Sequence, residues 1–281
     1  MTAKIIDGSK LAENITLRIK TEIKKMKIRP GLAVVLVGNN PASEVYVSMK
    51  EKKCKEIGFY SKKIILSDDI SESDLLGVVD DLNQDPKIHG VLVQLPLPKH
   101  IDEQLIIDSI LPHKDADGFN PINMGNLFVG NNLIIPATPK GIIQLIESTK
   151  VSLEGKQAVV VGRSNIVGKP VAMLLQQKNC TVTMCHSKTK NLENHTRQAD
   201  ILVAAVGNAR MISAEMVKPG AIVIDAGITK IHGKLVGDVD FSGVRKVAGF
   251  ITPVPGGVGP MTIACLLENT LECMELQKKV L

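Results

Sequence analysis

Short apolar runs alternate along this chain with longer segments in which apolar residues recur every three or four positions. The run GLAVVLVG at 31–38 has no polar side chain, as expected of a strand that is buried on both faces. Segment 71–83 instead carries its apolar residues at the spacing of one helix face. This alternation is typical of parallel strands joined by helical crossovers, and it predicts an α/β fold.

The pattern also predicts the order of the elements. In the first half we expect strand 31–38, helix 41–58, strand 63–66, helix 71–83 and strand 90–95. In the second half we expect strand 157–161, helix 169–178 and strands 181–185, 201–205 and 221–225. The second set has the rhythm of a Rossmann-type parallel sheet that binds a nucleotide.

The two halves are separated by residues 112–139, which are rich in Asp, Asn, Gly and Pro. We expect a long functional loop or an interdomain crossing there, with a domain boundary near Thr138. The apolar spacing of 261–279 predicts a last helix that packs back on the first domain. The expected domains are therefore residues 1–138 plus 264–281, and residues 139–263.

Composition narrows the class of function. The 281 residues are 44% hydrophobic and 22% charged, as in an ordinary folded protein. With five Phe, two Tyr and no Trp, the chain lacks the aromatic side chains on which bases stack, so we expect no nucleic-acid partner. The net charge of +5 is spread along the chain and suits anionic small molecules.

The cysteines and the apolar segments bear on metals, membranes and location. Five cysteines without a CxxC spacing predict neither a zinc site nor disulfides, so we expect no metal and a reducing, cytoplasmic setting. The start, MTAKIIDGSK, lacks the pattern of a signal peptide. The uncharged stretch 248–267 contains three prolines and four glycines, so we expect no membrane span.

The segment VVVGRSNIVGKP at 159–170 is the strongest indication of a cofactor. It places Gly162 at a strand end and Gly168 at a helix start, where backbone N–H groups can receive a pyrophosphate. The spacing is not GxGxxG, and a tight structural turn would also need these glycines. The next strand ends in CHSK rather than in a carboxylate. With Arg163, Lys188 there favours NADP over NAD, although both could be solvated surface charges.

Several polar residues stand at positions where a ligand could be held. Tyr46 and Lys50 lie four apart on the predicted helix 41–58, so they share one face. A desolvated lysine can act as a general acid or base, although most lysines on such a helix are exposed. Gln94 interrupts an apolar strand near its carboxyl end, either to meet a ligand or as a core glutamine.

Two loops could complete a site. In KDADG, Asp115 or Asp117 could accept hydrogen bonds from adjacent N–H groups of a ligand, although a turn alone explains Asp-Gly. The run TPVPGGVGPMT at 252–262 combines three prolines with three glycines immediately before a helix. Such a loop is rigid and allows a flat ligand to approach closely, unless it is only a structural turn.

Together these segments resemble the methylenetetrahydrofolate dehydrogenase/methenyltetrahydrofolate cyclohydrolase family over nearly the whole chain. The matching stretches are GNNPASEVYVSMK (38–50), GVLVQLPLP (90–98), KDADGF (114–119), TPKGI (138–142), VVGRSNIVGKPVAMLL (160–175), CHSKT (185–189) and ITPVPGGVGPMT (251–262). The resemblance implies an N-terminal catalytic domain, a Rossmann-type NADP domain and folate held in the cleft between them. It also implies a cytosolic homodimer.

The resemblance assigns roles to individual residues. It implies that Lys50 is the general acid/base, with Tyr46 and Gln94 hydrogen-bonding around it, and that Asp117 binds the pterin ring. The implied cofactor contacts are Gly162, Arg163, Ser164, Ser187 and Ile228, and the implied folate loop is Pro255, Gly256 and Gly257. Lys188 and Asn120 depart from the family, which commonly has arginine and histidine there.

The implied activity has two steps. The first is the NADP-dependent oxidation of 5,10-methylenetetrahydrofolate to 5,10-methenyltetrahydrofolate, and the second is hydrolysis of that product to 10-formyltetrahydrofolate. The alternatives are an enzyme with the dehydrogenase activity alone and a dinucleotide sensor without turnover.

Overall fold

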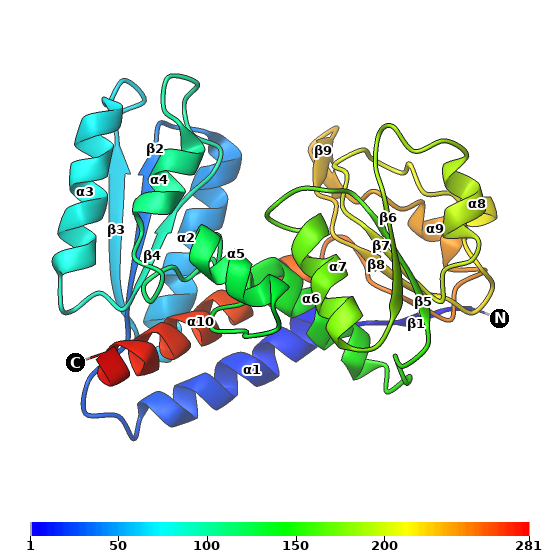
Figure 1. Cartoon of the computed structure of the whole chain (residues 1–281), viewed down its shortest axis with the longest axis horizontal. Helices are drawn as coiled ribbons and strands as arrows, with labels where there is room; N and C mark the ends of the chain where they lie inside the picture. Colours follow the sequence, from blue (N-terminus) through cyan, green and yellow to red (C-terminus); the bar gives the residue numbers. More distant parts are fainter. Residues whose placement is uncertain (1, 281) are drawn as a thin grey trace. The chain divides into compact units, whose positions relative to one another are not determined.

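The computed structural model of the chain describes residues 2–280 (Figure 1). It divides into two compact units. Unit 1 comprises the residues up to Glu13 together with Thr138–Cys265. Unit 2 comprises Asn14–Ala137 together with the chain from Leu266 onward. Helices α1 (Gly8–Ile23) and α10 (Val258–Val280) each contribute residues to both units.

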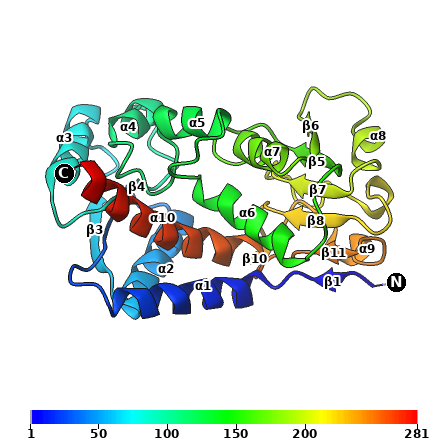
Figure 2. The ribbon, with the colours of Figure 1, turned by 60° about the horizontal axis from the view of Figure 1, so that its bottom comes forward.

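Unit 1 is built on a six-stranded sheet in which every neighbouring pair is parallel. The strands, in spatial order, are β1 (Lys4–Ile5), β11 (Phe250–Ile251), β8 (Ile222–Asp225), β7 (Ile201–Ala204), β5 (Gln157–Val161) and β6 (Thr181–Cys185). From β5 the chain adds β6 on one side and then crosses to β7 on the other (Figure 2). This reversal makes it a doubly wound, Rossmann-type sheet.

The remaining elements of unit 1 surround this sheet. They are helices α6 (Ala137–Ser148), α7 (Gly168–Gln177), α8 (Leu192–Thr196) and α9 (Phe241–Val244), the 3₁₀ turn Ala214–Met216, and the antiparallel hairpin β9 (Thr229–Ile231) and β10 (Lys234–Val236). Strands β7 and β8 are buried along their whole length, because helices cover both faces of such a sheet. Leu202 and Ala204 of β7 and Val223 of β8 are therefore part of the hydrophobic core of unit 1.

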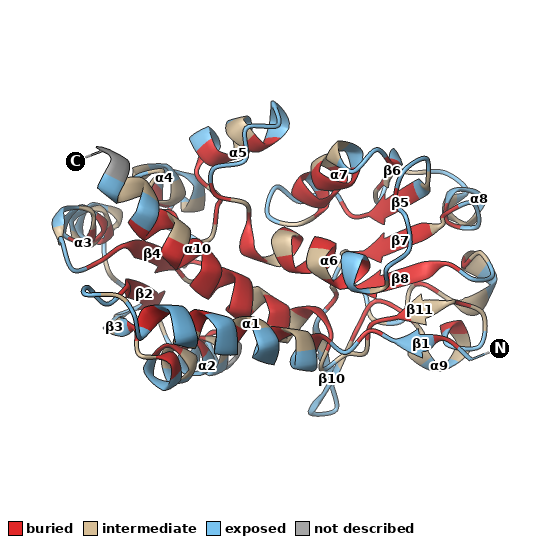
Figure 3. Cartoon of the chain, turned by 90° about the horizontal axis from the view of Figure 1, so that it is seen from below, coloured by how far each residue is buried: buried red, intermediate tan, exposed pale blue. Residues whose placement is uncertain are grey.

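Unit 2 contains a three-stranded parallel sheet in the order β3 (Tyr60–Leu66), β2 (Gly31–Val37) and β4 (Gly90–Val93). Its helices are α2 (Pro41–Ile57), α3 (Glu72–Gln84), α4 (Glu103–Ser109) and α5 (Pro121–Phe128), with the later part of α10. The central strand β2 is buried throughout, and α10 is buried along most of its length (Figure 3). No helix among the described residues is long and apolar enough to cross a membrane.

Most expected elements are confirmed within one to three residues at each end. The α/β class is confirmed, and residues 266–280 group with unit 2 as the return of the last helix required. Ser71 caps α3 by accepting a hydrogen bond from the backbone N–H of Asp74 at 3.1 Å. Helix α1 was not among the expected elements, although its buried residues Ala12, Thr16, Ile19 and Ile23 recur at the spacing of one helix face.

Two expectations were wrong. The expected first domain included residues 1–13, but β1 pairs with β11 in the sheet of unit 1. A two-residue strand is too short to show a period in the sequence. The expected loop at 112–139 contains α5, which begins with Asn120 as its cap and Pro121 at its first position. Asn120 accepts a hydrogen bond from the backbone N–H of Ile122 at 2.9 Å, so its side chain has a structural role there.

Candidate active site

Lys50 lies on α2 with only 7% of its surface exposed. The helix starts as the sequence indicates, because the Asn40 side chain accepts a hydrogen bond from the backbone N–H of Ser43 at 3.2 Å. The Lys50 Nζ donates to Oε1 of Gln94 at 3.0 Å. The lysine is thus a buried amine with a fixed partner rather than an exposed surface charge.

Gln94 directly follows β4 and continues its ladder, donating its backbone N–H to the carbonyl of Val35 at 2.8 Å. Its side-chain Nε2 donates to the carbonyl of Leu95 at 2.8 Å. Since the amide nitrogen is held by the backbone, Oε1 is directed toward Lys50. The site therefore forms at the carboxyl edge of the sheet, where open α/β sheets place their ligands.

The KDADG loop runs beside β4, and one of its two aspartates organises it. The Asp115 carboxylate accepts hydrogen bonds from the backbone N–H of Gly118 at 3.0 Å and of Asn120 at 2.8 Å, and from Asn123 Nδ2 at 2.9 Å. Gly118 has φ of +76°, and a Cβ there would lie 2.7 Å from the backbone nitrogen of Pro136. Asp115 is therefore fully used by the protein itself.

Asp117 differs from Asp115, because its carboxylate receives no hydrogen bond from residues 2–280 and remains partly exposed. Its backbone carbonyl accepts from Ala137 N at 3.2 Å, which holds the main chain of the loop at this residue. Burial raises the pKa of Asp117 to about 6, with the Lys50 charge lowering it and the Asp115 charge raising it. An acceptor without a protein partner is what a ligand with N–H donors requires.

Burial also lowers the pKa of Lys50, against the opposing effect of the Asp117 charge. Tyr46 lies one turn earlier on the same face of α2 and is half-buried. Burial raises the pKa of Tyr46, so its phenol stays protonated and can donate a hydrogen bond. Unit 2 therefore brings together three groups, Lys50, Gln94 and Asp117, with Tyr46 on the same helix face as the lysine.

The glycine turn of unit 1 lies between β5 and α7. Gly162 has φ of +131°, and a Cβ there would lie 2.3 Å from the carbonyl oxygen of Ala205. A Cβ at Gly168 would lie 2.3 Å from the carbonyl oxygen of Gly162. The Ser164 hydroxyl accepts from the backbone N–H of Val167 at 3.2 Å and of Gly168 at 3.3 Å. The bare, close-packed turn before a ten-residue helix fits a dinucleotide pyrophosphate.

The other expected cofactor residues are also in unit 1. Arg163 is exposed beside the turn, and Ile228, after β8, is 42% exposed. Ser187 and Lys188 are exposed in a tight turn after β6, in which the backbone N–H of Lys188 donates to His186 Nδ1 at 3.1 Å. All four residues follow carboxyl ends of strands in one sheet.

The loop with Pro255, Gly256 and Gly257 belongs to unit 1 as well, and not to the unit of Lys50. The backbone N–H of Ser9 donates to the Gly256 carbonyl at 3.0 Å. A Cβ at Gly257 would lie 2.6 Å from the carbonyl oxygen of Pro253. The loop is thus packed tightly enough that a glycine is required.

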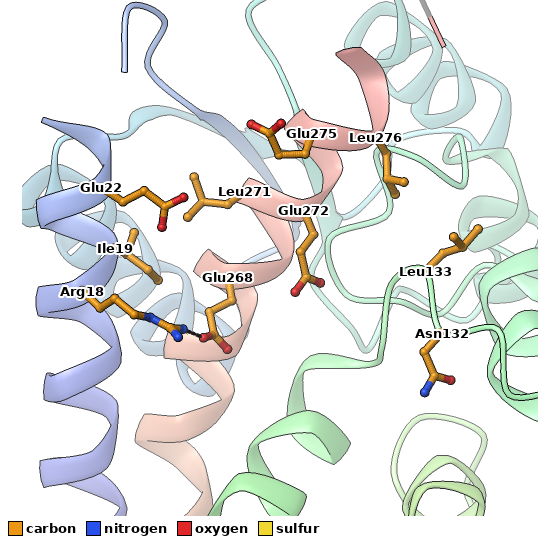
Figure 4. A pocket seen from close by; sticks show the side chains of 10 residues that line it. All are labelled: Arg18, Ile19, Glu22, Asn132, Leu133, Glu268, Leu271, Glu272, Glu275 and Leu276. Carbon is orange, nitrogen blue, oxygen red and sulfur yellow. Dashed lines mark hydrogen bonds and ion pairs between the residues drawn. The ribbon is translucent and has the colours of Figure 1, made fainter. Parts of the chain in front are cut away.

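A separate groove of about 470 Å³ lies in unit 2, between α1 and α10 (Figure 4). It is lined by Arg18, Ile19, Glu22, Asn132, Leu133, Glu268, Leu271, Glu272, Glu275 and Leu276. Arg18 and Glu268 form an ion pair across it. None of the expected site residues lines this groove.

One supporting residue was not anticipated. Asn269, fully buried on α10, donates from Nδ2 to the carbonyls of Ala116 at 2.9 Å and Ile135 at 2.7 Å. It thereby holds the loop that carries Asp117. The signal was a polar residue among the apolar positions of the last predicted helix, since a buried amide needs partners.

A Rossmann-type sheet with a glycine turn, and a buried lysine with an amide and a carboxylate, define a dinucleotide-dependent enzyme. The catalytic-domain model of tetrahydrofolate dehydrogenase/cyclohydrolase matches residues 6–117, and the NAD(P)-binding-domain model of the same family matches residues 136–278. The chain belongs to the tetrahydrofolate dehydrogenase/cyclohydrolase family, which confirms the resemblance.

Individual relatives agree over the full length. The bifunctional protein FolD of Brevibacillus brevis is 54% identical over 99% of this chain and 100% of its own. The crystal structure of the Campylobacter jejuni bifunctional enzyme FolD has a TM-score of 0.95 and 47% identity, covering 98% of this chain and 99% of that one. The Trypanosoma brucei enzyme, in complex with NADP and an inhibitor, has a TM-score of 0.95 and 37% identity, covering 99% of both.

Proposed function

We propose that this protein oxidises 5,10-methylenetetrahydrofolate to 5,10-methenyltetrahydrofolate with NADP and hydrolyses the product to 10-formyltetrahydrofolate. The observation that carries the proposal is the buried Lys50 amine at 3.0 Å from Gln94 Oε1, with an unpartnered Asp117 carboxylate in the same unit. A protein that only sensed a dinucleotide would have no use for these three groups in its other unit.

The residues of unit 1 suit NADP. The backbone N–H groups that follow Gly162 and open α7 would hold the pyrophosphate, and Arg163, Ser164, Ser187 and Lys188 would surround the adenosine half. Lysine lacks the planar fork of arginine, so Lys188 would hold a 2′-phosphate by charge alone. NADP, when bound, supplies the acceptor of the hydride, and the protein contributes binding and orientation.

Lys50 is the proposed general acid/base of hydrolysis. A group that moves protons near neutral pH is most effective when its pKa is close to that pH. Burial lowers the pKa of Lys50 from its ordinary value, and so brings it closer to neutral pH. Gln94 fixes the position of Nζ, and the Tyr46 phenol can donate to the same region. The methenyl substrate carries a positive charge, which would further favour the neutral amine.

Asp117 is the proposed contact to the pterin ring. The ring presents adjacent N–H donors, and an ionised carboxylate accepts two of them with good geometry. With its pKa at about 6, Asp117 is mostly ionised at neutral pH. Pro255, Gly256 and Gly257 are proposed to line the folate site from their own unit.

We further propose a cytoplasmic homodimer. All five cysteines are buried, and none forms a disulfide with another described cysteine, as suits a reducing compartment. The hairpin of β9 and β10 pairs only with itself among the described strands, and its Ile231 and Leu235 are 39% and 43% exposed. Apolar side chains on such an arm suit contact with a second copy. The folate-binding catalytic domain would comprise mainly unit 2.

The experiment supplies the pure protein with 5,10-methylenetetrahydrofolate and NADP, and follows NADPH formation by absorbance. In a second assay the protein receives 5,10-methenyltetrahydrofolate and the disappearance of its absorbance is followed. We expect turnover in both assays. NADPH formation without accelerated hydrolysis would leave only the dehydrogenase, and NADP binding without turnover in either assay would refute the proposal.

A further inference from the structure

Two buried carboxylates lie at the carboxyl edge of the sheet of unit 1, on segments other than the glycine turn. Asp225 is the last residue of β8 and is 3% exposed. Asp238 follows the β9–β10 hairpin and is fully buried. Neither side chain belongs to the sites described above, and no ion pair joins either of them to a basic side chain in the described part of the chain. Two buried acids without a cation are costly, which calls for a reason.

Asp238 holds the loop that follows β7. Its Oδ2 accepts hydrogen bonds from the backbone N–H of Val206 at 2.7 Å and of Gly207 at 3.0 Å. Its Oδ1 is buried and has no hydrogen-bond partner among the described residues. One carboxylate oxygen therefore fixes two successive N–H groups just beyond the strand end.

Asp225 holds the loops that follow β8 and β10. Its Oδ1 accepts from the backbone N–H of Gly227 at 3.0 Å and of Asp238 at 2.9 Å, and its Oδ2 accepts from Val239 N at 2.9 Å. Its own N–H donates to the Thr252 hydroxyl at 2.8 Å, at the end of β11. The two acids thus connect the loops after three adjacent strands.

The packing around this pair leaves no space for adjustment. A Cβ at Gly227 would lie 2.2 Å from Asp238 Cγ, and a Cβ at Gly237 would lie 1.9 Å from Asp225 Oδ2. The backbone of both loops is therefore in direct contact with the carboxylates. A change in either acid must move the loops rather than be absorbed by a void.

The place of the pair in the sheet indicates which part of a dinucleotide it affects. The strand order reverses at β5, with β6 on one side and β7 and β8 on the other. A dinucleotide lies across this reversal, and the adenosine half follows the side of β6. The other half then lies over the ends of β7 and β8, where the two acids hold the N–H groups of Val206, Gly207 and Gly227.

We propose that Asp225 and Asp238 are positioning residues for the nicotinamide half of NADP, acting through the two loops whose N–H groups they hold. This inference rests on the proposed dehydrogenase. Neither acid need touch the cofactor. Their role is to keep the loops after β7 and β8, and with them Ile228, in the conformation that receives it.

The test measures NADP binding by calorimetry together with the two activities. Asp238→Ala removes both hydrogen bonds to the β7 loop, and we expect the Kd for NADP to rise about tenfold or more. Asp238→Asn keeps an acceptor oxygen of the same size and should restore most of the affinity. Hydrolysis of methenyltetrahydrofolate depends on Lys50 in the other unit and should stay within about twofold of the wild type.

The matched control is Asp200→Asn, at the opposite edge of the same sheet, where the carboxylate accepts from Gln157 N and Lys218 Nζ. It should leave NADP affinity unchanged. If Asp238→Ala does not fold, Asp225→Asn provides the same test, since one amide oxygen cannot replace two carboxylate oxygens that accept three N–H groups.

The result that overturns the inference is wild-type NADP affinity in the folded Asp238→Ala and Asp225→Asn proteins. An equal loss of affinity in Asp238→Ala and Asp238→Asn would also contradict it, because the hydrogen bonds would then not be the cause. Failure of the proposed function can be distinguished from failure of this inference, because in that case the wild-type protein itself would bind NADP without producing NADPH.

Discussion

Replacement of Lys50 by methionine is the sharpest test of the proposed hydrolytic step. Methionine has nearly the length of lysine and no ionisable group, so it fills the same space beside α2. The change removes the hydrogen bond from Nζ to Gln94 Oε1 at 3.0 Å, together with the attraction between the charges of Lys50 and Asp117. Gln94 is half-buried, so water can replace the lost donor.

The expected magnitude follows from the role assigned to the amine. Proton transfer by a positioned side chain increases a rate by about 100- to 10,000-fold, which corresponds to an activation barrier lowered by about 3 to 5 kcal/mol. We expect Lys50→Met to slow methenyltetrahydrofolate hydrolysis by a factor in that range. Stability should not decrease, because a buried polar group whose pKa is lowered by burial is replaced by an apolar one.

The assay follows the absorbance of methenyltetrahydrofolate, with NADPH formation measured on the same preparation. Lys55→Met is the matched control, because Lys55 is on the same helix but exposed, where it pairs with Glu51. The Lys55→Met protein should lose no more than about 0.5 kcal/mol of its free energy of unfolding, and it should keep both activities. Hydrolysis at the wild-type rate in Lys50→Met would refute the role of the amine, whereas an equal loss in Lys55→Met would point to damage to the helix.

Four further outcomes follow from the same geometry. Gly162→Ala should raise the Kd for NADP tenfold or more, because the added Cβ would lie 2.3 Å from the Ala205 carbonyl oxygen. Calorimetry measures this Kd, and an unchanged value would show that the turn is not the cofactor site. Asp117→Ala should raise the KM for folate by about tenfold in both activities, and an unchanged KM would remove Asp117 from the substrate site. For pH, the ionised Asp117 loses its charge as pH falls through about 6, so the KM for folate should rise below that pH. Hydrolysis should increase with pH through a midpoint below 10.5, because the burial that lowers the pKa of Lys50 favours its neutral form, and a pH-independent rate would contradict this.

The regular part of the fold was predictable because burial imposes a period on the sequence. Strands β2 and β5 and helix α3 each show an unbroken apolar run or one apolar helix face, bounded by a cap or a glycine. Elements stabilised by few residues or by distant partners were not predictable. The two residues of β1 acquire their strand conformation only by pairing with β11, about 245 positions further along the chain.

Helix α5 shows a different reason for failure. Its sequence, PINMGNLF, contains glycine, proline and two asparagines, so its composition resembles a loop. The helix forms because Asn120 caps it and Asn123 donates to the Asp115 carboxylate at 2.9 Å. Composition alone cannot distinguish an asparagine that ends a helix from one that begins it.

The candidate site could be narrowed from the sequence but not resolved. The pattern of the strand could not separate a core glutamine from a functional one at Gln94, and in the structure its Nε2 donates to backbone while its Oε1 accepts from Lys50. The choice between Asp115 and Asp117 as the ligand contact depends on which carboxylate already accepts hydrogen bonds from backbone N–H groups, and this is Asp115. That depends on the path of the loop, which spacing does not specify.

A perturbed pKa does not by itself separate a functional lysine from a structural one, as Lys114 shows. Burial lowers the pKa of Lys114 as it does that of Lys50. Lys114 Nζ, however, donates to the carbonyls of Leu82 at 3.2 Å and Asp85 at 2.9 Å, and so completes the end of α3. An ammonium has three donors, and Lys50 directs one of them to the side-chain oxygen of Gln94 rather than to backbone carbonyls. The donors of Lys50 that Gln94 does not use, and the Asp117 carboxylate that accepts no hydrogen bond from residues 2–280, therefore fit the proposed substrate site.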